Sequence, residues 1–433
     1  MMFFFEDEIG EAQKVKISAE QINGILGIKE SFELPDRLME ILSAPESRED
    51  MFNKFLALVD DLSFDWFTDY FQESHSNRDN MMQDFTPPAL CAMLPEIAGS
   101  YRNAADFCAG TGGLTIAAWN KNKSALFYCA ELSKRAFPLL LFNLAIRNMD
   151  ALAVNQDILS GEIYGIYRLT PGERFSRMET LDRLPELPLF DYVMMNPPYS
   201  LKHKWNEKEG DPRFMGYGYP PSQFSDFAFV LHGLYQMKDG GTLCAILPHG
   251  VLFRGNKEAT IRRTLIENKL VYAVIGLPEK LFLNTGIPVC VLVLRKSENT
   301  LVIDASKDFK AAAKQNFLTA ENTEKILSAL RLRVSIDKFA CLAGMGEIAE
   351  NDYNLNIPRY VDTYEPPPPI DIVAVTREMA DLNRQIRQTE RKLLSYFRDM
   401  VGMDEQHKNE MREIVTIWEG ICGEYAEQTS EAL

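Results

Sequence analysis

Short apolar runs alternate with helical patterns through the middle of the chain. Four of these runs have a polar residue at or just after their carboxyl end: Asp106, Glu131, Asp157 and Asn196. Apolar runs of about four to eight residues are typical of buried strands, and helical patterns between them favour a parallel sheet. Ligands of such open α/β sheets bind where the strands end. The pattern therefore predicts an α/β domain of about seven strands over residues 81–300, with a functional site at these four ends.

The segments on either side of this domain have different patterns. Residues 1–80 are predicted to form a helical domain, because large apolar residues recur at mixed helical spacing in their second half. Residues 301–365 are predicted as an extension and linker. A run of prolines then opens a helical region over residues 366–433, and such a run is a stiff spacer that no helix crosses.

The C-terminal region carries a regular apolar seam. Its positions recur alternately every three and four residues: Ile372, Val375, Met379, Leu382, Ile386, Thr389, Leu393, Tyr396 and Met400. Such a heptad seam predicts a helix that packs lengthwise on a second helix. That second helix belongs either to another protein subunit or to residues 409–425 of the same chain.

Composition sets limits on the class of protein. The chain of 433 residues, 46% of them hydrophobic, is long enough for two or three domains with a large core. Its seven cysteines include no Cys-x-x-Cys pair and no cluster with histidine. Neither a zinc site nor a disulfide framework is therefore indicated, and the reducing cytoplasm is the expected location. The apolar residues 1–5 are followed by acids and fit neither a signal peptide nor a membrane span.

The net charge of −16 is concentrated in one part of the chain. Residues 1–85 contain 19 acidic and 7 basic residues, which leaves a net charge of −4 for the remainder. A protein that binds nucleic acid without help normally has a basic surface. If this chain acts on nucleic acid, we expect another protein to supply much of the contact with the phosphates.

The apolar run over residues 190–195 leads into Asn196-Pro197-Pro198-Tyr199, a sequence suited to holding a planar amine. The Asn196 side-chain oxygen and the Pro197 carbonyl can each accept one N–H of an exocyclic amine such as that of adenine. This concentrates the lone pair of the nitrogen on the side that faces an electrophile. Consecutive prolines stiffen the loop, and the Tyr199 ring can stack on an extruded base. The alternative is an ordinary turn, since Asn-Pro often opens loops.

A glycine-rich turn lies upstream, over residues 106–113, between a strand and a helix. Its glycines allow positive φ and close approach of the backbone to a ligand, although a plain tight turn has the same pattern. Glu131 follows about 20 residues later, where dinucleotide-binding folds carry the acid that binds ribose. The order of this loop, Glu131, Asp157 and Asn196 favours one functional site over a series of unrelated turns.

With these motifs in order, the chain resembles the S-adenosylmethionine-dependent adenine DNA methyltransferases, and more closely the modification subunit of type I restriction–modification systems. The resemblance extends from about residue 85 to about residue 398. Further segments that match this subunit are residues 85–88, 240–255, 274–282, 289–294 and 351–361. The chain departs from the family at Phe107, where proline is more usual.

The resemblance implies a Rossmann-like sheet of seven strands and a role for particular residues. Around the cofactor it places Phe85, Thr86, Pro87, Asp106, Cys108, Gly110, Thr111, Gly112, Gly113, Glu131, Leu132, Asp157, Ile158 and Asn196. Glu131 would hold the ribose hydroxyls and Asp157 the adenine ring of the cofactor, with Ile158 packed against that ring. The catalytic residues would be Asn196, Pro197, Pro198 and Tyr199, with Phe282 over the second face of the flipped base.

The implied function is transfer of a methyl group from S-adenosylmethionine to N6 of an adenine flipped out of double-stranded DNA, without a metal. The implied partners are a specificity subunit bound to the heptad helix over residues 370–400, a second modification subunit and a restriction subunit, and no membrane. Two polar stretches, residues 160–188 and 201–222, are predicted to interrupt the domain. The second is expected to be mobile and to contact DNA, or else to be a plain solvated loop: it holds Lys202, His203, Lys204, Trp205 and Arg213.

Two other functions stay open. The same Asn-Pro-Pro-Tyr chemistry serves methylation of a glutamine amide in proteins and of bases in RNA. The segments after Gly240 and the heptad seam favour the DNA enzyme over these. A non-catalytic scaffold of the same fold is the third possibility, and the intact set of four polar strand ends argues against it.

Overall fold

The computed structural model describes residues 17–68, 70, 85–205, 210–282, 286–312, 315–364, 370–400 and 404–427. The chain forms two compact units, residues 1–363 and residues 364–433. Among the described residues, no helix is both long enough and apolar enough to cross a membrane. The proline run and the apolar residues 1–5 lie outside the described part of the chain.

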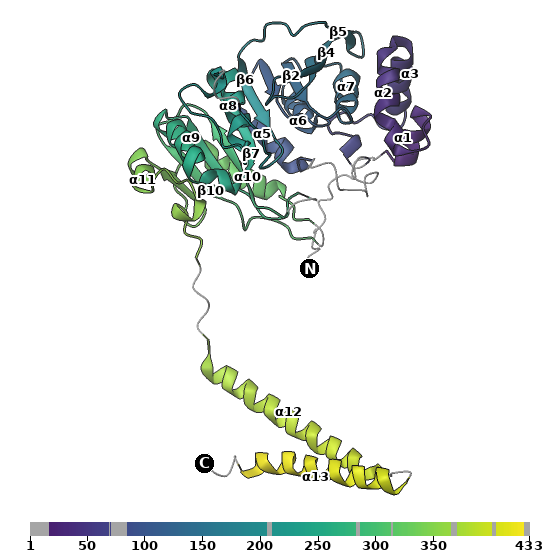
Figure 1. Cartoon of the computed structure of the whole chain (residues 1–433), viewed down its shortest axis with the longest axis vertical. Coiled ribbons are helices and arrows are strands. Elements are labelled where there is room, and N and C mark those ends of the chain that lie inside the picture. The colour runs from purple at the N-terminus through teal and green to yellow at the C-terminus, as the bar shows by residue number, and fades with distance from the viewer. Residues whose placement is uncertain are drawn as a thin grey trace, which may run out of the picture. The chain divides into compact units, whose positions relative to one another are not determined.

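The first unit is built on an eleven-stranded sheet (Figure 1). Along the chain its strands are β1 (Asn103–Asp106), β2 (Leu126–Glu131), β3 (Asp150–Gln156), β4 (Ile163–Thr170), β5 (Arg177–Thr180), β6 (Phe190–Met195), β7 (Met237–Pro248), β8 (Val271–Gly276), β9 (Val289–Leu294), β10 (Thr300–Asp304) and β11 (Ala340–Ala343). Their order in space is β11-β10-β8-β9-β7-β6-β1-β2-β3-β4-β5.

The predicted strand count was too low, because the sheet has additional strands at both edges. The inner seven strands, β8-β9-β7-β6-β1-β2-β3, are parallel except for β9, which pairs antiparallel with both of its neighbours. The antiparallel pair β4 and β5 lies within residues 160–188, which were predicted only as a polar interruption of the domain. Most side chains of these two strands are partly or fully exposed, so the continuous apolar run that marks a buried strand is missing. At the other edge, β10 and β11 carry the sheet past residue 300.

Helices cover both faces of the sheet. The described helices of this unit are α1 (Ala19–Leu26), α2 (Leu34–Ser43), α3 (Pro45–Leu56), α5 (Pro88–Ala98), α6 (Gly113–Lys121), α7 (Phe137–Ile146), α8 (Asp226–Gln236), α9 (Asn256–Glu267), α10 (Ala320–Leu332) and α11 (Met345–Glu350), with short 3₁₀ helices at Ser31–Glu33, Pro212–Phe214, His249–Leu252 and Ile357–Arg359. Successive strand residues point to opposite faces. Phe127 and Cys129 of β2 therefore pack in the core with α5, α6, α7 and α10, whereas Tyr128 and Ala130 pack in the core with α8 and α9.

The N-terminal helices share a core with the sheet. Helix α2 lies beside α7, and α1 and α3 pack against α2 (Figure 1). The fully buried ring of Phe142 in α7 is surrounded by four aromatic rings of the N-terminal segment, with centroids 4.8 to 6.3 Å away: Phe52, Phe55, Trp66 and Phe67. Aromatic pairs at such distances add to the free energy gained by burial. The division of the chain into four domains stays a prediction.

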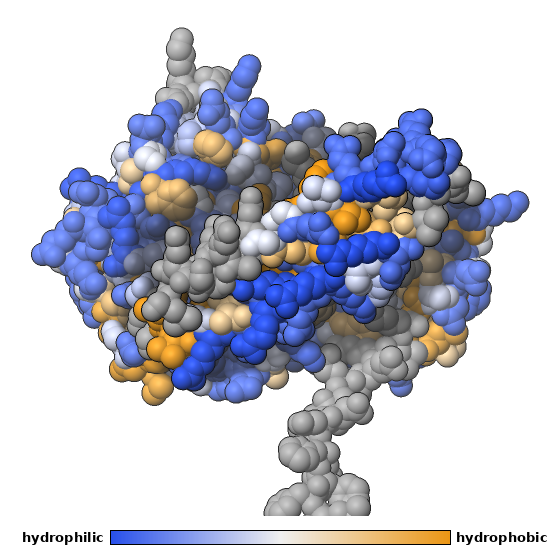
Figure 2. All heavy atoms as spheres, turned by 90° about the horizontal axis from the view of Figure 1, so that it is seen from below, coloured by the Kyte–Doolittle hydropathy of each residue, from blue (hydrophilic) through white to orange (hydrophobic). Residues whose placement is uncertain are grey.

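The surface of the first unit is mostly polar on the side that Figure 2 displays. Hydrophilic side chains predominate there, and apolar side chains lie between them in separate patches. Single exposed apolar residues are normal on protein surfaces and need no special explanation.

The second unit consists of two helices, α12 (Ile372–Asp399) and α13 (Glu405–Glu427). They contact each other near the end of α12, where the Phe397 and Trp418 rings lie 5.6 Å apart and Arg398 forms an ion pair with Glu419. Leu394 is buried there. Leu394 is not a seam position: of the seam itself Leu393 is partly buried and the other positions are exposed, so α13 covers little of the seam.

Replacing Phe142 with alanine should lower the free energy of unfolding by about 3–5 kcal/mol, because it leaves a cavity among four aromatic rings. Phe32 is 67% exposed, so Phe32→Ala is the matched control and should change stability by less than about 0.5 kcal/mol. Denaturant unfolding followed by fluorescence measures both values. Equal effects of the two substitutions would show that the N-terminal segment does not share a core with α7.

Candidate functional site

Four polar strand ends lie side by side along one edge of the sheet. Strands β6, β1, β2 and β3 are consecutive and parallel, so their carboxyl ends point the same way. β1 ends at Asp106 and β2 at Glu131, while Asp157 and Asn196 directly follow β3 and β6. The chain order reverses at β1, which lies between β2 and β6, and ligands of open α/β sheets bind at such a point. This prediction of a shared edge is confirmed.

The glycine loop after β1 requires its glycines. Gly110 and Gly112 have φ of 56° and 100°, in the left-handed region that side chains disfavour. A Cβ on Gly112 would also lie 3.1 Å from Leu140 Cδ1 of α7. The loop leads into α6, and its backbone is thereby kept close to the edge of the sheet where the strand ends meet.

Glu131 braces the glycine loop. Its Oε2 accepts a hydrogen bond from the Gly110 N–H at 2.7 Å, and its Oε1 accepts one from the Ser133 N–H at 2.6 Å. The side chain is buried, at 6% exposed. Carboxylate oxygens accept hydrogen bonds from hydroxyl groups such as those of a ribose. The ribose role of Glu131 stays a prediction.

Asp106 is a buried carboxyl group that suits a cationic ligand. Its Oδ2 accepts a hydrogen bond from the Thr115 hydroxyl at 2.9 Å, while Oδ1 is buried and has no hydrogen-bond partner among the described groups. The pKa of Asp106 is raised to about 7, mainly by burial and to a lesser extent by the nearby Glu131 charge, against the lowering effect of hydrogen bonds from Thr115 and the Cys108 amide. An ammonium group at Oδ1 would satisfy the orphan oxygen and stabilise the carboxylate.

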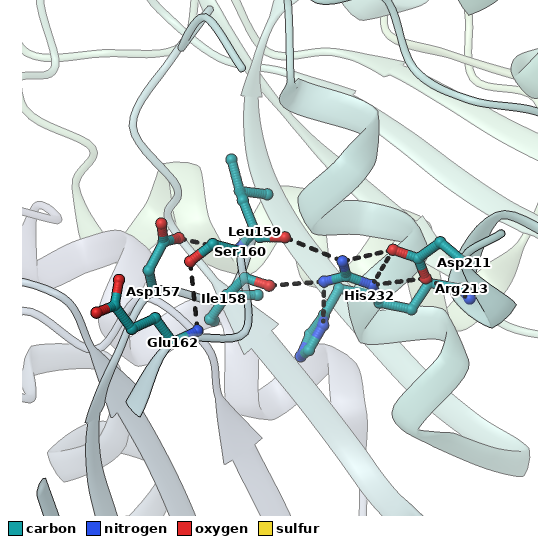
Figure 3. A network of polar contacts seen from close by, with 8 residues as sticks. All are labelled: Asp157, Ile158, Leu159, Ser160, Glu162, Asp211, Arg213 and His232. Carbon is teal, nitrogen blue, oxygen red and sulfur yellow. Dashed lines mark hydrogen bonds and ion pairs between the residues drawn. The ribbon is translucent and has the colours of Figure 1, made fainter. Parts of the chain in front are cut away.

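The turn after β3 is clamped from a distant segment (Figure 3). The guanidinium group of Arg213 donates to the carbonyls of Ile158 and Leu159 at 2.6 and 3.0 Å, and its Nη2 lies 2.6 Å from Asp211 Oδ2. It also lies 3.3 Å from His232 Nδ1. Burial first, and then the Arg213 charge, lower the pKa of His232 to about 3, so this ring is neutral at pH 7 and accepts the contact.

Arg213 does not face solvent as a residue of a mobile or plain solvated loop would, although DNA contact by the rest of the loop stays a prediction. The Arg213 side chain is only 15% exposed and is held by the carbonyls just described. The same loop has its own small aromatic core, in which the Phe214 ring lies 5.0 Å from Trp205 and 5.2 Å from Tyr219. Lys202 and Lys204 remain exposed. Part of this loop, residues 206–209, lies outside the described residues.

The Asn-Pro-Pro-Tyr segment forms a connected group with two other predicted residues. Asn196 Nδ2 donates to the Thr86 hydroxyl at 3.0 Å, and the Tyr199 hydroxyl donates to Asn196 Oδ1 at 2.9 Å. The Tyr199 and Phe282 rings meet edge to face, with centroids 6.3 Å apart and an interplanar angle of 83°. The structure thus brings Thr86, Asn196, Tyr199 and Phe282 together.

A buried charged network, which the sequence analysis missed, holds the end of this segment. Ser200 has a φ of 54°, and its N–H donates to Asp226 Oδ1 at 2.7 Å. Arg254 donates to Asp226 Oδ2 at 2.9 Å and to the Ser200 hydroxyl at 3.3 Å. A Cβ on Gly250 would lie 2.4 Å from the guanidinium group, so glycine makes room for Arg254. Burial raises the pKa of the neighbouring Glu258 to about 7.

The other predicted residues lie along the same edge. Phe85 and Pro87 precede α5, Cys108 and Thr111 belong to the glycine loop, and Gly113 begins α6. Leu132, just after Glu131, is 50% exposed, whereas Ile158 is 6% exposed. Pro197 is buried and Pro198 is partly exposed. The individual roles of these residues stay predictions. Within the described ranges, no group of three or more His, Cys, Asp or Glu side chains could hold a metal ion.

The geometry of the site and the comparison with known proteins indicate the same class of protein, a methyltransferase. The sheet, its inner strand order and its glycine loop define a Rossmann-like methyltransferase, and the chain is 31% identical, with a TM-score of 0.61, to the crystal structure of the methyltransferase subunit of a type I restriction–modification system from Streptococcus thermophilus. The match covers 79% of each chain. Residues 62–366 match the N-6 DNA Methylase family, and the chain belongs to that family.

Other relatives are longer than this chain. It is 28% identical over 326 residues to the methylase subunit of the type I restriction enzyme MpnII from Mycoplasma pneumoniae, and 33% identical over 229 residues to that of MjaVIII from Methanocaldococcus jannaschii. These matches cover 70% and 49% of the chain. The chain spans 58% and 39% of the length of these two relatives.

Binding of S-adenosylmethionine, the expected cofactor, should depend on pH through Asp106. The carboxyl group, with a pKa of about 7, must lose its proton to face a cation. Affinity should therefore be constant above about pH 7.5 and fall by up to about tenfold per pH unit below about pH 7. Calorimetric titration between about pH 5.5 and 8 measures it. Asp106→Asn should bind weakly and without this slope, whereas a flat wild-type profile would contradict the assignment.

Proposed function

We propose that the chain is a site-specific DNA adenine N6-methyltransferase, the modification subunit of a type I restriction–modification system, which uses S-adenosylmethionine and acts with a separate specificity subunit. The observation that carries this proposal is the convergence of Asp106, Glu131, Asp157 and Asn196 on one edge of the sheet in a member of the N-6 DNA methylase family. The names of the similar type I methylase subunits support it.

The residues around the glycine loop fit the cofactor in charge and shape. The orphan oxygen of Asp106 suits the ammonium group of the methionine end, and Glu131 suits the ribose hydroxyls. Asp157 and Ile158 would receive the adenine ring of the cofactor, in a turn that Arg213 holds rigid. The cofactor supplies a methyl group made electrophilic by a sulfonium, so the transfer needs no metal.

Asn196 orients the amine of the substrate. Because its Nδ2 donates to the Thr86 hydroxyl at 3.0 Å, its Oδ1 is the atom left to accept an N–H. The Pro197 carbonyl would accept the second N–H of the same amine. These two acceptors draw the lone pair of the nitrogen toward the methyl carbon, and holding the reacting atoms in line accounts for much of the rate. The Tyr199 hydroxyl donates to the same Oδ1 at 2.9 Å. When the base binds, Oδ1 either accepts both hydrogen bonds or loses the one from Tyr199.

Tyr199 and Phe282 form the two sides of the pocket for the flipped base. In the structure their rings are nearly perpendicular and touch, so one of them must turn before a flat base can lie between them. Base flipping requires such a pocket, because the target atom cannot be reached inside a duplex. The bond between Tyr199 and Asn196 keeps the ring beside the amine acceptors until the base arrives.

The specificity subunit would bind the apolar seam of α12. Seven seam residues are between 44% and 74% exposed: Ile372, Val375, Met379, Leu382, Ile386, Tyr396 and Met400. A row of exposed apolar side chains at heptad spacing is typical of a helix that pairs with another chain. The near-neutral charge of the first unit beyond residue 85 also favours a partner that supplies DNA contacts. A second modification subunit and a restriction subunit would complete the complex, in the cytoplasm.

The direct test is transfer of a labelled methyl group from S-adenosylmethionine to unmethylated DNA, by the purified chain alone and with its candidate specificity subunit. Label on adenine N6 only when the partner is present is the expected result. Label on adenine with the chain alone would overturn the partner part of the proposal. Label on RNA or on a protein glutamine, with none on DNA, would overturn the proposed substrate.

Asn196→Ala should lower methyl transfer at least about a hundredfold, because it removes an acceptor that polarises the amine. The affinity for S-adenosylmethionine should change by less than about threefold, since the other cofactor contacts persist. Asn268→Ala removes an exposed amide at the end of α9 and is the matched control, with transfer unchanged. If Asn196→Ala lost cofactor binding as strongly as methyl transfer, Asn196 would have a structural role instead.

A further inference from the structure

Asp65 lies in the segment of residues 61–68, which follows α3 and contacts the glycine loop. Its carboxylate accepts hydrogen bonds from four donors. Asp65 Oδ1 accepts hydrogen bonds from the Phe67 N–H at 3.0 Å and from Asn143 Nδ2 at 2.8 Å. Its Oδ2 accepts from the Thr68 hydroxyl at 2.9 Å and from the Thr111 hydroxyl at 2.5 Å. A carboxylate offers about four lone-pair sites, so these bonds use its full capacity.

The contact with Thr111 reaches the middle of the glycine loop. Thr111 and Asn143 are 2% and 0% exposed. Asn143 Nδ2 donates to the Thr111 carbonyl at 2.8 Å as well as to Asp65, so α7 and Asp65 hold both the backbone and the side chain of Thr111. Glu131 holds the preceding residue, Gly110, from the side of β2. The loop is therefore fixed from two sides, by a carboxylate on each.

A buried cation secures the segment that carries Asp65. Arg147 of α7 donates to the carbonyls of Leu62 and Phe64 at 2.8 and 2.5 Å, and to the Asn143 side-chain oxygen at 2.8 Å. Burial lowers the pKa of Arg147 to about 10, and the charge of Asp65 opposes that shift, so the guanidinium group stays charged at neutral pH. A buried charge is stable only where hydrogen bonds replace the water it has lost, and the bonds of Arg147 to these oxygens do so here.

We propose that Asp65 is a positioning residue for the cofactor. Through its hydrogen bond with Thr111 it fixes the conformation of the glycine loop, so the N-terminal segment contributes to cofactor binding. The proposal rests on the proposed use of S-adenosylmethionine. Replacing Glu131 or Asp65 with a neutral residue would weaken the hold on the loop, because hydrogen bonds to a charged acceptor are stronger than those to a neutral one. Loss of the Asp65 contact frees the Thr111 side chain and leaves Asn143 alone to hold the Thr111 carbonyl, so the backbone that faces the cofactor becomes less firmly fixed.

The test uses the full chain and two readouts. The first is the affinity for S-adenosylmethionine, measured by calorimetry on Asp65→Ala, Thr111→Val and the double variant. Each single change should weaken binding about tenfold, and the double variant should be no weaker than Asp65→Ala, because Thr111→Val removes a bond that Asp65→Ala has already removed. Asp50→Ala, which removes an exposed acid paired with Lys54 on α3, is the matched control and should bind as the wild type does.

The second readout needs no cofactor. Amide hydrogen exchange of residues 109–113 should be faster in Asp65→Ala than in the wild type, and unchanged in Asp50→Ala. Asp65→Asn keeps one acceptor oxygen in place, so it should fall between the wild type and Asp65→Ala in both readouts and serves if the alanine variant does not fold.

The outcomes separate the inference from the function. Unchanged exchange and unchanged affinity in a folded Asp65 variant would overturn the inference, and so would full additivity in the double variant. A wild-type chain that binds no S-adenosylmethionine would overturn the proposed cofactor instead, while faster exchange in Asp65→Ala would still establish the control of the loop by Asp65.

Discussion

Parallel pairing of β1 with β2 on one side and β6 on the other is the constraint on which the rest of the site depends. In this register Asp106 lies opposite Cys129 of β2 and Met194 of β6. β2 continues two residues and β6 one residue past these partners, so the three strands end close together and the residues that follow them meet at one edge. The glycine loop, Glu131 and Asn196 are far apart in the sequence, and this strand pairing brings them together in one site.

The site is rigid because charged groups hold its loops from outside. Glu131 and Asp65 hold the glycine loop, Arg213 holds the turn after β3, and Arg254 with Asp226 holds the end of the Asn-Pro-Pro-Tyr segment. Each group is partly or fully buried and is bound to backbone or side-chain donors and acceptors. Such support keeps the reacting groups in their geometry and reduces the reorganisation that reaction would require.

Local sequence patterns predicted the strand ends and the glycine loop, because a buried strand and a tight turn each have a recognisable pattern within a few residues. Long-range contacts have no such local pattern. Asp65 and Thr111 are 46 residues apart, and Arg213 reaches Ile158 across 55 residues. Arg213 was read as a solvent-facing residue of a polar loop, since nothing nearby in the sequence revealed its acceptors. Strands β4 and β5 were missed for a related reason: partly exposed edge strands lack the apolar run that identifies buried ones.

The most direct test of this account is a crystal structure of the chain with S-adenosylmethionine or its demethylated product bound. The account predicts the amino group of the ligand at Asp106 Oδ1, its ribose hydroxyls at Glu131 and its adenine ring at Asp157 and Ile158, with the Asp65 to Thr111 contact retained. A ligand bound away from this edge of the sheet, or bound here with Asp106 facing no cation, would contradict it.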